Sequence, residues 1–485
     1  MSLVIISSKM EAKIEKEKEK SSVSFRQLLS AYKGDCSVHG VGHVGRGSFF
    51  RGLIWFAAVC TSTSYLLYLL YEEWTAYYQY PFMTSTSVQK VSTMKFPAIT
   101  FCNLSPYNKS VVVSDPRDEE FYMAISKLGI FVDDINWTDP YYRDNGYFTP
   151  RTRDDVATEA LNRRAVIKSI TFDMGDVGQD IEETVTRYGM CYTWNSNGSA
   201  TTSSTGNNFN FYALLSVNSD QSYQSIDCST GFKVTVHDPN EDPAIENNGF
   251  LVPPGKFALA KLKKTRYSYL GDPFKAFGDA SCVDTLSSDF NNPFHPKLYD
   301  TSACRRKCNT DQTFQRCGCM AMGSNGNYPI CSHYQYYQCY YNTSRPSENS
   351  LSPCDCPQPC RQTTYDIQVS YATFPTEETA EFLKGRFNVT KDYIRQNFVE
   401  LHIYFDNLQV HRVKQEPVYA STKDILSNIG GQMGLLLGAS LLSLLEISEF
   451  LVNCAIHLMF KCYDWYNGKR RNKIKQNSEK TGLQN

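Results

Sequence analysis

The chain has 485 residues, enough for about three ordinary domains. Its 49 basic and 50 acidic residues give a formal net charge of −1, which excludes the simplest electrostatic case for a nucleic-acid partner. A mean hydropathy of −0.40 and 20% charged residues exclude wholesale disorder, whereas 17 cysteines and 13% aromatic residues are unusual for an ordinary soluble protein.

An apolar span follows the N-terminal tail of residues 1–50, which is Lys-rich near its start. Residues 51–71 contain no charge after the first position, and as a helix they cover about 30 Å, the thickness of a bilayer core. A cleaved signal peptide fits poorly, because about fifty mostly polar residues precede the span. A buried core helix is an alternative, but Trp55 and Phe56 help to make nearly every face apolar. We therefore predict a transmembrane helix.

Residues 72–424 form a long polar segment between this span and a second one. The segment contains all the Asn-x-Ser/Thr glycosylation patterns, at Asn103, Asn108, Asn136, Asn197, Asn342 and Asn388. Asn103 follows a cysteine directly, and we expect it to be buried and unmodified. The other five are candidate glycosylation sites of an extracellular domain.

Local patterns within this segment predict a mixed α+β domain. Alternating or continuous apolar runs predict strands at Val166–Asp173, Phe209–Ser216, Phe232–His237 and Val399–Phe405. Two short helices are expected at Glu377–Lys384 and Lys391–Asn397, the second with Thr390 as N-cap. The polar stretch Asn195–Asn208 is expected to be a mobile surface loop.

Thirteen of the 17 cysteines lie in this segment, and ten of them crowd between residues 282 and 360. The pairs Cys317-Gly-Cys319 and Cys354-Asp-Cys356 have a spacing seen in some metal sites, so zinc is an alternative. In an extracellular segment, disulfides that staple a small module are the preferred interpretation. The four remaining cysteines, Cys36, Cys60, Cys454 and Cys462, lie in the tails or spans and are expected to be reduced.

The second apolar span covers residues 425–460 and is interrupted by Glu446 and Glu449. Carboxylates inside a spanning helix usually face a bundle interior or water. Gly430, Gly434 and Gly438 share one helix face, which favours close helix packing. The following tail, residues 461–485, is rich in Lys and Arg. The positive-inside rule therefore predicts that both termini are cytoplasmic.

Several motifs in this order resemble the degenerin/epithelial sodium channel family, and especially its acid-sensing ion channel branch. They are Ser37-Val-His39-Gly40 before the first span, Phe96-Pro-Ala-Ile-Thr-Phe-Cys102 after it, Thr186-Arg-Tyr-Gly-Met-Cys191, the Cys304-x3-Cys308 … Cys317-x-Cys319 block, and Asn428-Ile-Gly-Gly-Gln-Met-Gly434-Leu-Leu-Leu-Gly438-Ala439-Ser440. The resemblance covers about Phe25 to Lys475. It implies a β-sheet palm with a helical thumb and finger, in a trimeric channel with two transmembrane helices per subunit.

The resemblance also implies roles for individual residues. Gly438, Ala439 and Ser440 would form the selectivity filter, braced by the re-entrant His39-Gly40 motif, and Glu446 and Glu449 would form acidic rings in the pore. Ser427 and Asn428 would lie at the gate, and Tyr80 and Phe274 would couple the extracellular domain to the pore. The implied disulfides are Cys102–Cys191, Cys282–Cys360, Cys304–Cys356, Cys308–Cys354, Cys317–Cys339 and Cys319–Cys331, which leaves Cys228 without a partner.

The expected function is a sodium-selective or sodium-preferring, amiloride-sensitive and voltage-independent cation channel of the plasma membrane. Membrane lipid and identical or related subunits are the expected partners, Na⁺ is the permeant ion, and neither a cofactor, a metal nor nucleic acid is expected. Acid-sensing relatives have a His pair shortly after the first span, where this chain has Pro81 and Phe82. Their palm aspartate corresponds to His402, which we interpret as structural, and most of their acidic-pocket carboxylates are missing. These departures favour an extracellular ligand such as a peptide, or constitutive activity, over strong proton activation.

Alternatives from other classes remain. A proton-gated channel keeps the same fold. A trimeric ATP-gated channel would need clustered basic residues with that family's motifs, which Lys261–Arg266 lacks. A non-conducting two-pass receptor or adhesion protein does not explain Glu446 and Glu449. An ectoenzyme is disfavoured, because nothing near His295 pairs a nucleophile with a base.

Overall fold

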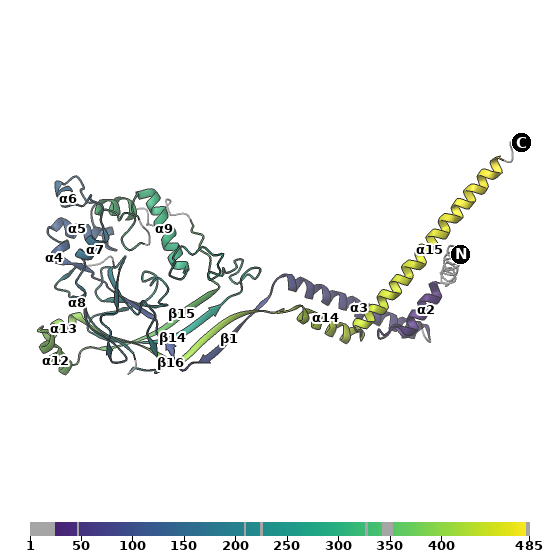
Figure 1. Cartoon of the computed structure of the whole chain (residues 1–485), viewed down its shortest axis with the longest axis horizontal. Helices are drawn as coiled ribbons and strands as arrows, with labels where there is room; N and C mark the ends of the chain where they lie inside the picture. The colour runs from purple at the N-terminus through teal and green to yellow at the C-terminus, as the bar shows by residue number, and fades with distance from the viewer. Residues whose placement is uncertain are drawn as a thin grey trace, which may run out of the picture. The chain divides into compact units, whose positions relative to one another are not determined.

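The computed structural model describes residues 25–45, 48–207, 210–223, 227–324, 328–341 and 353–481. The chain divides into two compact units (Figure 1). Met1–Phe82 and Pro417–Asn485 form the helical unit, and Met83–Glu416 forms the β-rich unit. Candidate glycosylation site Asn342 lies outside the described residues.

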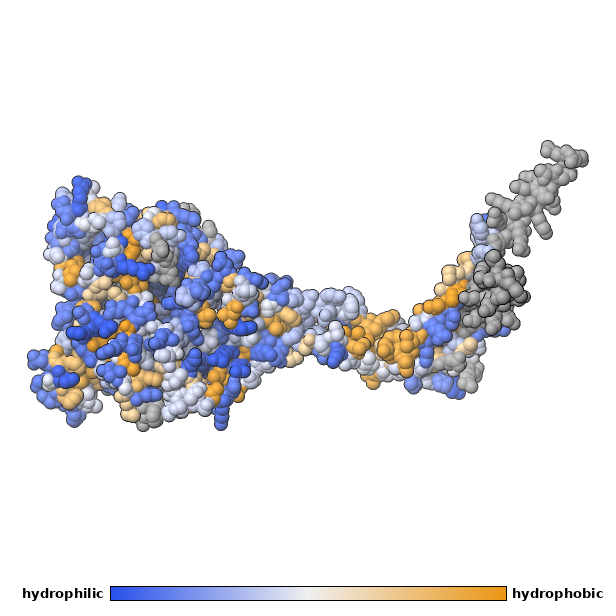
Figure 2. All heavy atoms as spheres, in the orientation of Figure 1, coloured by the Kyte–Doolittle hydropathy of each residue, from blue (hydrophilic) through white to orange (hydrophobic). Residues whose placement is uncertain are grey.

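Apolar helices dominate the helical unit. Its elements are α2 (Phe25–Asp35), η1 (Val41–His43), α3 (Phe49–Tyr78), α14 (Thr422–Leu437) and α15 (Leu441–Thr481). Among the residues that the structure describes, two helices, Phe49–Tyr78 and Leu441–Tyr463 within α15, are long and apolar enough to cross a membrane. Figure 2 shows apolar residues along α3 and the first part of α15, as expected for helices that face lipid rather than water.

The helices differ in extent from the predicted spans. Helix α3 continues to Tyr78, seven residues beyond the predicted end at Tyr71, and Glu72 within this extension accepts a hydrogen bond of 2.5 Å from Tyr68 one turn earlier. The predicted second span, residues 425–460, consists of two helices with a break at residues 438–440. Sequence hydropathy detects the apolar run but does not detect where its backbone leaves the helix.

Two main sheets build the β-rich unit. The larger has seven strands in the order β15-β14-β16-β10-β5-β6, with β1 also paired to β16; the smaller has five in the order β13-β12-β3-β8-β7. Along the order of each sheet, the strand pairs are antiparallel except the parallel β14–β16 pair. The strands are β1 (Phe82–Lys90), β3 (Ala98–Asn103), β5 (Ile167–Phe172), β6 (Gly175–Asp176), β7 (Ile181–Thr186), β8 (Gly189–Trp194), β10 (Phe211–Ser216), β12 (Phe232–His237), β13 (Phe250–Val252), β14 (Lys256–Ser268), β15 (Arg361–Thr373) and β16 (Phe398–Pro417). Two-stranded pairs are formed by β2 (Met94–Lys95) with β9 (Thr201–Thr202) and by β4 (Tyr107–Asn108) with β11 (Ser222–Tyr223).

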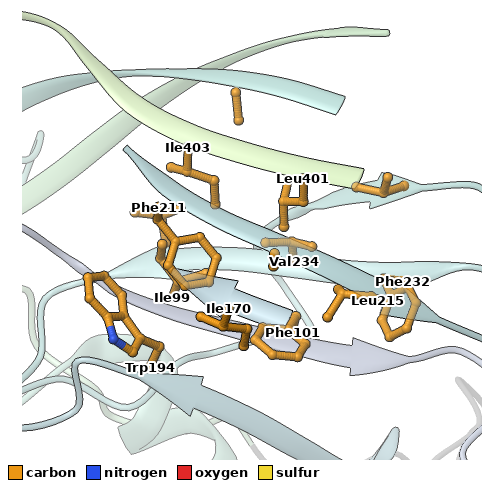
Figure 3. Packing of buried hydrophobic residues seen from close by; sticks show 14 of the residues in the cluster. Ile99, Phe101, Ile170, Trp194, Phe211, Leu215, Phe232, Val234, Leu401 and Ile403 are labelled. Carbon is orange, nitrogen blue, oxygen red and sulfur yellow. The ribbon is translucent and has the colours of Figure 1, made fainter. Parts of the chain in front are cut away.

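The main core of this unit combines apolar side chains from both sheets (Figure 3). Phe101 and Phe232 from the five-stranded sheet are fully buried in the same cluster as Phe211 and Leu401 from the seven-stranded sheet. Side chains of a strand alternate between its two faces, so each strand contributes every second residue to this layer. Burying one such large apolar side chain contributes about 1.5–3 kcal/mol to the free energy of unfolding.

Helices and disulfides complete the β-rich unit. The longest of its helices, α9 (Thr301–Cys317), begins at Asp300, whose side chain accepts a hydrogen bond from the Ala303 amide, and ends at Gly318 with φ of 70°. The shorter helices are α4 (Lys109–Val112), α5 (Pro116–Ala124), η2 (Gly129–Phe131), α6 (Pro140–Asp144), α7 (Arg153–Glu159), α8 (Arg163–Val166), α10 (His333–Gln335), η3 (Tyr336–Tyr341), α12 (Glu377–Phe387) and α13 (Lys391–Asn397). The six disulfides of the described residues are those that the resemblance implies. Three of them join α9 to other segments, namely to residues 354–356 and to Cys339. A fourth joins Cys319, just after α9, to Cys331.

The local predictions agree with most of these elements. Strand β12 and helix α13 have the predicted bounds, and the Thr390 side chain accepts from the Tyr393 amide as its N-cap role requires. The expectation of a mobile loop from Asn195 onward is wrong for its first part. Asn195 is buried, and its side-chain amide donates to the carbonyls of Phe96 and Pro97 at 2.9 and 3.2 Å. A polar composition did not reveal these backbone partners.

Candidate functional site

The break between α14 and α15 places three small residues outside regular helix. Gly438 ends α14 in the left-handed conformation, with φ of 56°, and its amide donates to the carbonyl of Gly434 at 3.0 Å. Ala439 is buried and donates to Met433 O at 3.3 Å. Backbone that leaves the helix at membrane depth needs other polar partners or a water-lined cavity.

The His39-Gly40 segment supplies part of that support. The His39 amide donates to the carbonyl of Leu437, the last residue of α14, at 2.9 Å. A Cβ atom at position 438 would lie 1.8 Å from Nδ1 of His39, so only glycine leaves room for the imidazole. Gly40 has φ of 89° and faces α3, where a Cβ would approach Val59 Cγ2 to 2.9 Å. The motif therefore requires both glycines.

Ser37 joins the same segment to the start of α15. Its amide donates to Oε2 of Glu446 at 2.9 Å, and its hydroxyl lies 2.6 Å from that of Ser443. Ser443 is almost fully buried, and its hydroxyl also accepts from the Ser440 amide at 3.0 Å. Residues before the first span thus bond to both helices that flank the break.

Apolar contacts hold these elements together. Val38 packs in one buried cluster with Leu66 of α3, Met433 of α14 and Ala439 in the break. The sequence motifs predict His39-Gly40 and the small residues as one site, and the structure brings them together. The roles of Ser37 and Ser443 were missed, although a serine three residues after Ser440 has the spacing of a helix cap.

Glu446 and Glu449 differ in their surroundings. Glu446 is partly buried and bonded to Ser37, whereas Glu449 is exposed and forms no hydrogen bond or ion pair with the residues that the structure describes. Glu446 therefore has a bracing contact besides its predicted role in an acidic ring. The ring itself requires other subunits and stays a prediction.

The predicted gate residues Ser427 and Asn428 lie in α14, and both are exposed in the single chain. Asn428 Nδ2 donates to Glu73 Oε1 at 2.7 Å, which joins α14 to α3. The same oxygen accepts from the hydroxyl of Tyr419 at 3.0 Å. Sequence reasoning missed Glu73 and Tyr419, because nothing in their spacing shows that they meet Asn428.

The predicted coupling residues Tyr80 and Phe274 fall in different units. Tyr80 follows α3 with φ of 50°, and Phe274 follows the Asp272–Pro273 bond beyond β14. Their coupling stays a prediction.

The candidate glycosylation sites among the described residues are accessible, except Asn103, which is buried as expected. Asn136, Asn197 and Asn388 are exposed and Asn108 is half-buried. Asn103 is buried, and its amide donates to Val217 O at 3.1 Å. Cys228 is a free cysteine, as the pairing scheme implies.

His402 has the surroundings of a structural residue. Its Nε2 lies 2.9 Å from Glu400 Oε1, and its Nδ1 lies 2.8 Å from Asn207 Oδ1. The ring also packs edge-on against Tyr212 and Phe257, with centroids 5.0 and 4.8 Å away.

A carboxyl that sequence reasoning missed has a strongly altered acidity. Burial, together with the charges of Asp238 and Asp300, raises the pKa of Glu241 to about 8. Burial, together with the charges of Asp238 and Glu241, also raises the pKa of the Tyr365 phenol. Glu241 lies in the loop after β12, while Asp300 precedes α9, so the cluster forms only when these segments fold together. The expectation that the acidic-pocket carboxylates of acid-sensing relatives are mostly missing stays a prediction, and Glu241 is a separate carboxyl with a raised pKa.

Comparison with known proteins supports the reading of these elements. The family model described as amiloride-sensitive sodium channel matches residues 32–450. Acid-sensing ion channel 1C of Danio rerio is 27% identical over 87% of this chain and 83% of its own length. Acid-sensing ion channel 2 of Rattus norvegicus is 26% identical over 87% and 86%, and acid-sensing ion channel 1 of Gallus gallus is 26% identical over 94% and 88%.

A proton-activated chloride channel solved by cryo-EM also matches, covering 84% of this chain and 98% of its own. Its TM-score of 0.32 and identity of 6% are too low to inform the fold. The family match extends from α2 into α15 and so includes both helices, the disulfide-rich domain and the break between α14 and α15. The chain therefore belongs to the amiloride-sensitive sodium channel family, whose members are cation channels of the plasma membrane and not enzymes.

Proposed function

We propose that the chain is a subunit of a sodium-preferring, amiloride-sensitive and voltage-independent cation channel. The observation that carries the proposal is the helix break at Gly438–Ser440, braced by Ser37 and His39. Three copies of such a break would present backbone carbonyls around a narrow axis, where oxygens replace part of the ion's hydration shell. Na⁺ is then the permeant ion, and no cofactor takes part.

The proposed assembly is a trimer of identical or related subunits in membrane lipid, with both termini in the cytoplasm. Glu446 and Glu449 would concentrate cations at the cytoplasmic side of the filter. Neither span contains a series of arginines such as voltage sensors use, which supports voltage independence. Gating by an extracellular ligand, or constitutive opening, remains our first proposal, because Pro81 and Phe82 stand where acid-sensing relatives have a His pair.

Proton gating is a second candidate, favoured by Glu241. A carboxyl with a pKa of about 8 is mostly protonated at pH 7.4, and mild acid protonates the ionised fraction of about a fifth that remains. The relatives named above are acid-sensing ion channels, which is consistent with such a group.

The test is expression in oocytes under two-electrode voltage clamp. The proposal expects a sodium current that amiloride blocks, that disappears when a large organic cation replaces Na⁺, and that has an ohmic response to voltage steps. A large current evoked by mild acid and reduced in Glu241→Gln would favour the proton-gated alternative, whereas loss in His402→Ala would assign it to the histidine. No current from protein that reaches the cell surface, under any of these conditions, would favour a non-conducting receptor.

A further inference from the structure

A cavity of about 260 Å³ lies within the β-rich unit, and all its lining residues belong to that unit. Its walls come from the middle of α9 at residues 306–313, the turn between β7 and β8, the segment around Met322, and the aromatic residues of α10 and η3. Its size is slightly below the range for drug-like ligands, so it suits a molecule about as large as an amino acid or an aromatic acid.

Three arginines line this cavity, Arg151, Arg187 and Arg306, and Glu246 is the one acidic residue among the lining residues that the structure describes. Arg151 forms an ion pair with Glu159, and Nη2 of Arg306 lies 3.1 Å from Asp242 Oδ1. These two guanidinium groups are thus neutralised from outside the cavity. Arg187 has no ion pair or hydrogen bond with the described part of the chain.

The neutralised arginines still have unused hydrogen-bond donors. Nε of Arg151 and Nη1 of Arg306 are buried without an acceptor among the described residues. A buried donor left without a partner costs about 1–3 kcal/mol of stability. An anion in the cavity would offer acceptors to a lining that is rich in donors and poor in carboxylates.

The position of Arg187 is fixed by close backbone packing. Gly323 has φ of 76°, and a Cβ there would lie 2.4 Å from the Arg187 amide nitrogen. The Met322–Ser324 segment therefore lies directly on the β7–β8 turn that carries Arg187, so the guanidinium is presented from a constrained backbone.

Aromatic rings form the other wall. Tyr336 and Tyr340 are stacked, with ring centroids 5.0 Å apart and an interplanar angle of 25°. His333 also lines the cavity, and burial lowers its pKa to about 3, so its ring is neutral and adds no positive charge at physiological pH. An apolar or aromatic body would pack against these rings.

We propose that this cavity binds a small organic carboxylate, whose carboxylate group pairs with Arg187 and whose apolar body lies against Tyr336 and Tyr340. A guanidinium donates two parallel hydrogen bonds to a carboxylate, a geometry that lysine does not reproduce. The site is independent of the proposed conduction path, because all its residues belong to the β-rich unit.

The test measures thermal unfolding of the purified full-length protein in lipid nanodiscs with 3-phenylpropanoate, with its neutral amide and with L-phenylalanine. The acid should raise the unfolding temperature in a saturable way, and the amide should not. Arg187→Gln should weaken the apparent affinity for the acid at least tenfold, and Arg187→Lys should weaken it less. Arg305→Gln is the matched control, since Arg305 is an exposed neighbour on α9 that does not line the cavity.

The second arm distinguishes the two kinds of carboxylate. If L-phenylalanine binds more tightly than 3-phenylpropanoate and Glu246→Gln removes the difference, the ligand is an amino-acid zwitterion; if not, it is a simple acid. Tyr340→Ala should weaken the binding of both ligands without changing the charge of the cavity. This variant tests the site even if the Arg187 variants fail to fold. Equal binding of the amide, unchanged affinity in Arg187→Gln, or no response of the wild type to either carboxylate at millimolar concentration would overturn the proposal. Because no current is measured, such a result would leave the channel proposal standing.

Discussion

The amide of Ser37 donates a hydrogen bond to Glu446 across 409 positions of the chain. This bond joins the segment before the first span to α15, and the His39 amide bonds to the end of α14, so the candidate filter is supported from both of its sides. The support explains how a backbone break at Gly438 can persist between two helices of a membrane unit.

Two substitutions at Glu446 separate its bracing contact from its charge. Glutamine keeps an oxygen that accepts from Ser37 but removes the charge, so Glu446→Gln should keep sodium preference and lower single-channel conductance. Glu446→Ala should reduce both sodium preference and single-channel conductance, because it also removes the hydrogen bond from Ser37, and a bond to a charged acceptor contributes about 1.5–3 kcal/mol. Single-channel recording with ion substitution measures the two properties. Glu449→Gln is the control for charge alone, and equal effects of Gln and Ala at position 446 would contradict the bracing role.

Gly438→Ala should abolish current without preventing surface expression. The new methyl group would lie 1.8 Å from His39 Nδ1, and φ of 56° adds about 1–2 kcal/mol of backbone strain for a residue other than glycine. Surface biotinylation and voltage clamp measure the two outcomes. Gly430→Ala is the control, because nothing lies within 4 Å of a Cβ there. His39→Ala in the same chain should recover only part of the current, since it relieves the clash and not the strain; a fully active Gly438→Ala would refute the packing.

The contact of Asn428 with Glu73 predicts an effect on gating. Asn428→Asp places a second carboxylate where a donor lay 2.7 Å from Glu73, so α14 should separate from α3 and the fraction of amiloride-blocked current at rest should rise. Adding Glu73→Gln should restore the wild-type fraction, because its amide can donate to the new carboxylate. Tyr419→Phe, which removes the second donor to Glu73, should have a smaller effect. Failure of the double variant to restore gating would argue against this contact.

Ser427 is exposed on α14 one residue before this contact, at the predicted gate. We expect a Ser427→Cys channel to stay open after treatment with a bulky thiol reagent, because added bulk obstructs closure. Current is recorded before and after treatment, with the wild type as control for the native free cysteines, which are Cys36, Cys60, Cys228, Cys454 and Cys462 in the part of the chain that the structure describes. Unchanged current in the treated variant would place the gate elsewhere.

The sequence predicts well the strands and helices that depend on local residue patterns. It predicts poorly the hydrogen bonds between segments that are distant in the chain. Alternation located β12, capping located α13, and motif resemblance supplied the six disulfides. The partners of Glu446 and Asn428 lie more than 350 positions away, and no local rule pairs them. Asn195 looked like part of a polar loop because the carbonyls that bury its amide belong to another segment.

Glu241 shows the same limit for acidity, and its pKa predicts a definite pH dependence. Its pKa in the fold, about 8, lies above the ordinary value of 4.5, so folding favours the protonated form. Its stabilising contribution is complete below pH 4.5 and is lost as pH rises through 8. Glu241→Gln, which mimics the protonated group, should therefore raise the unfolding temperature of the full-length protein at pH 9 and change it little at pH 4.5.

The charges of Asp238 and Asp300 help to raise the pKa of Glu241. Asp300→Asn should therefore lower the pH at which the stabilising contribution of Glu241 is lost. Asp300 also caps α9, but asparagine keeps an oxygen that can accept from the Ala303 amide, so any change in capping should be small and the same at every pH, which separates it from the titration. Glu378→Gln, at an exposed position of α12, is the control for removing one carboxylate. A difference between wild type and Glu241→Gln that does not change between pH 4.5 and 9 would show that this carboxyl has an ordinary pKa, and would remove the structural support for proton gating.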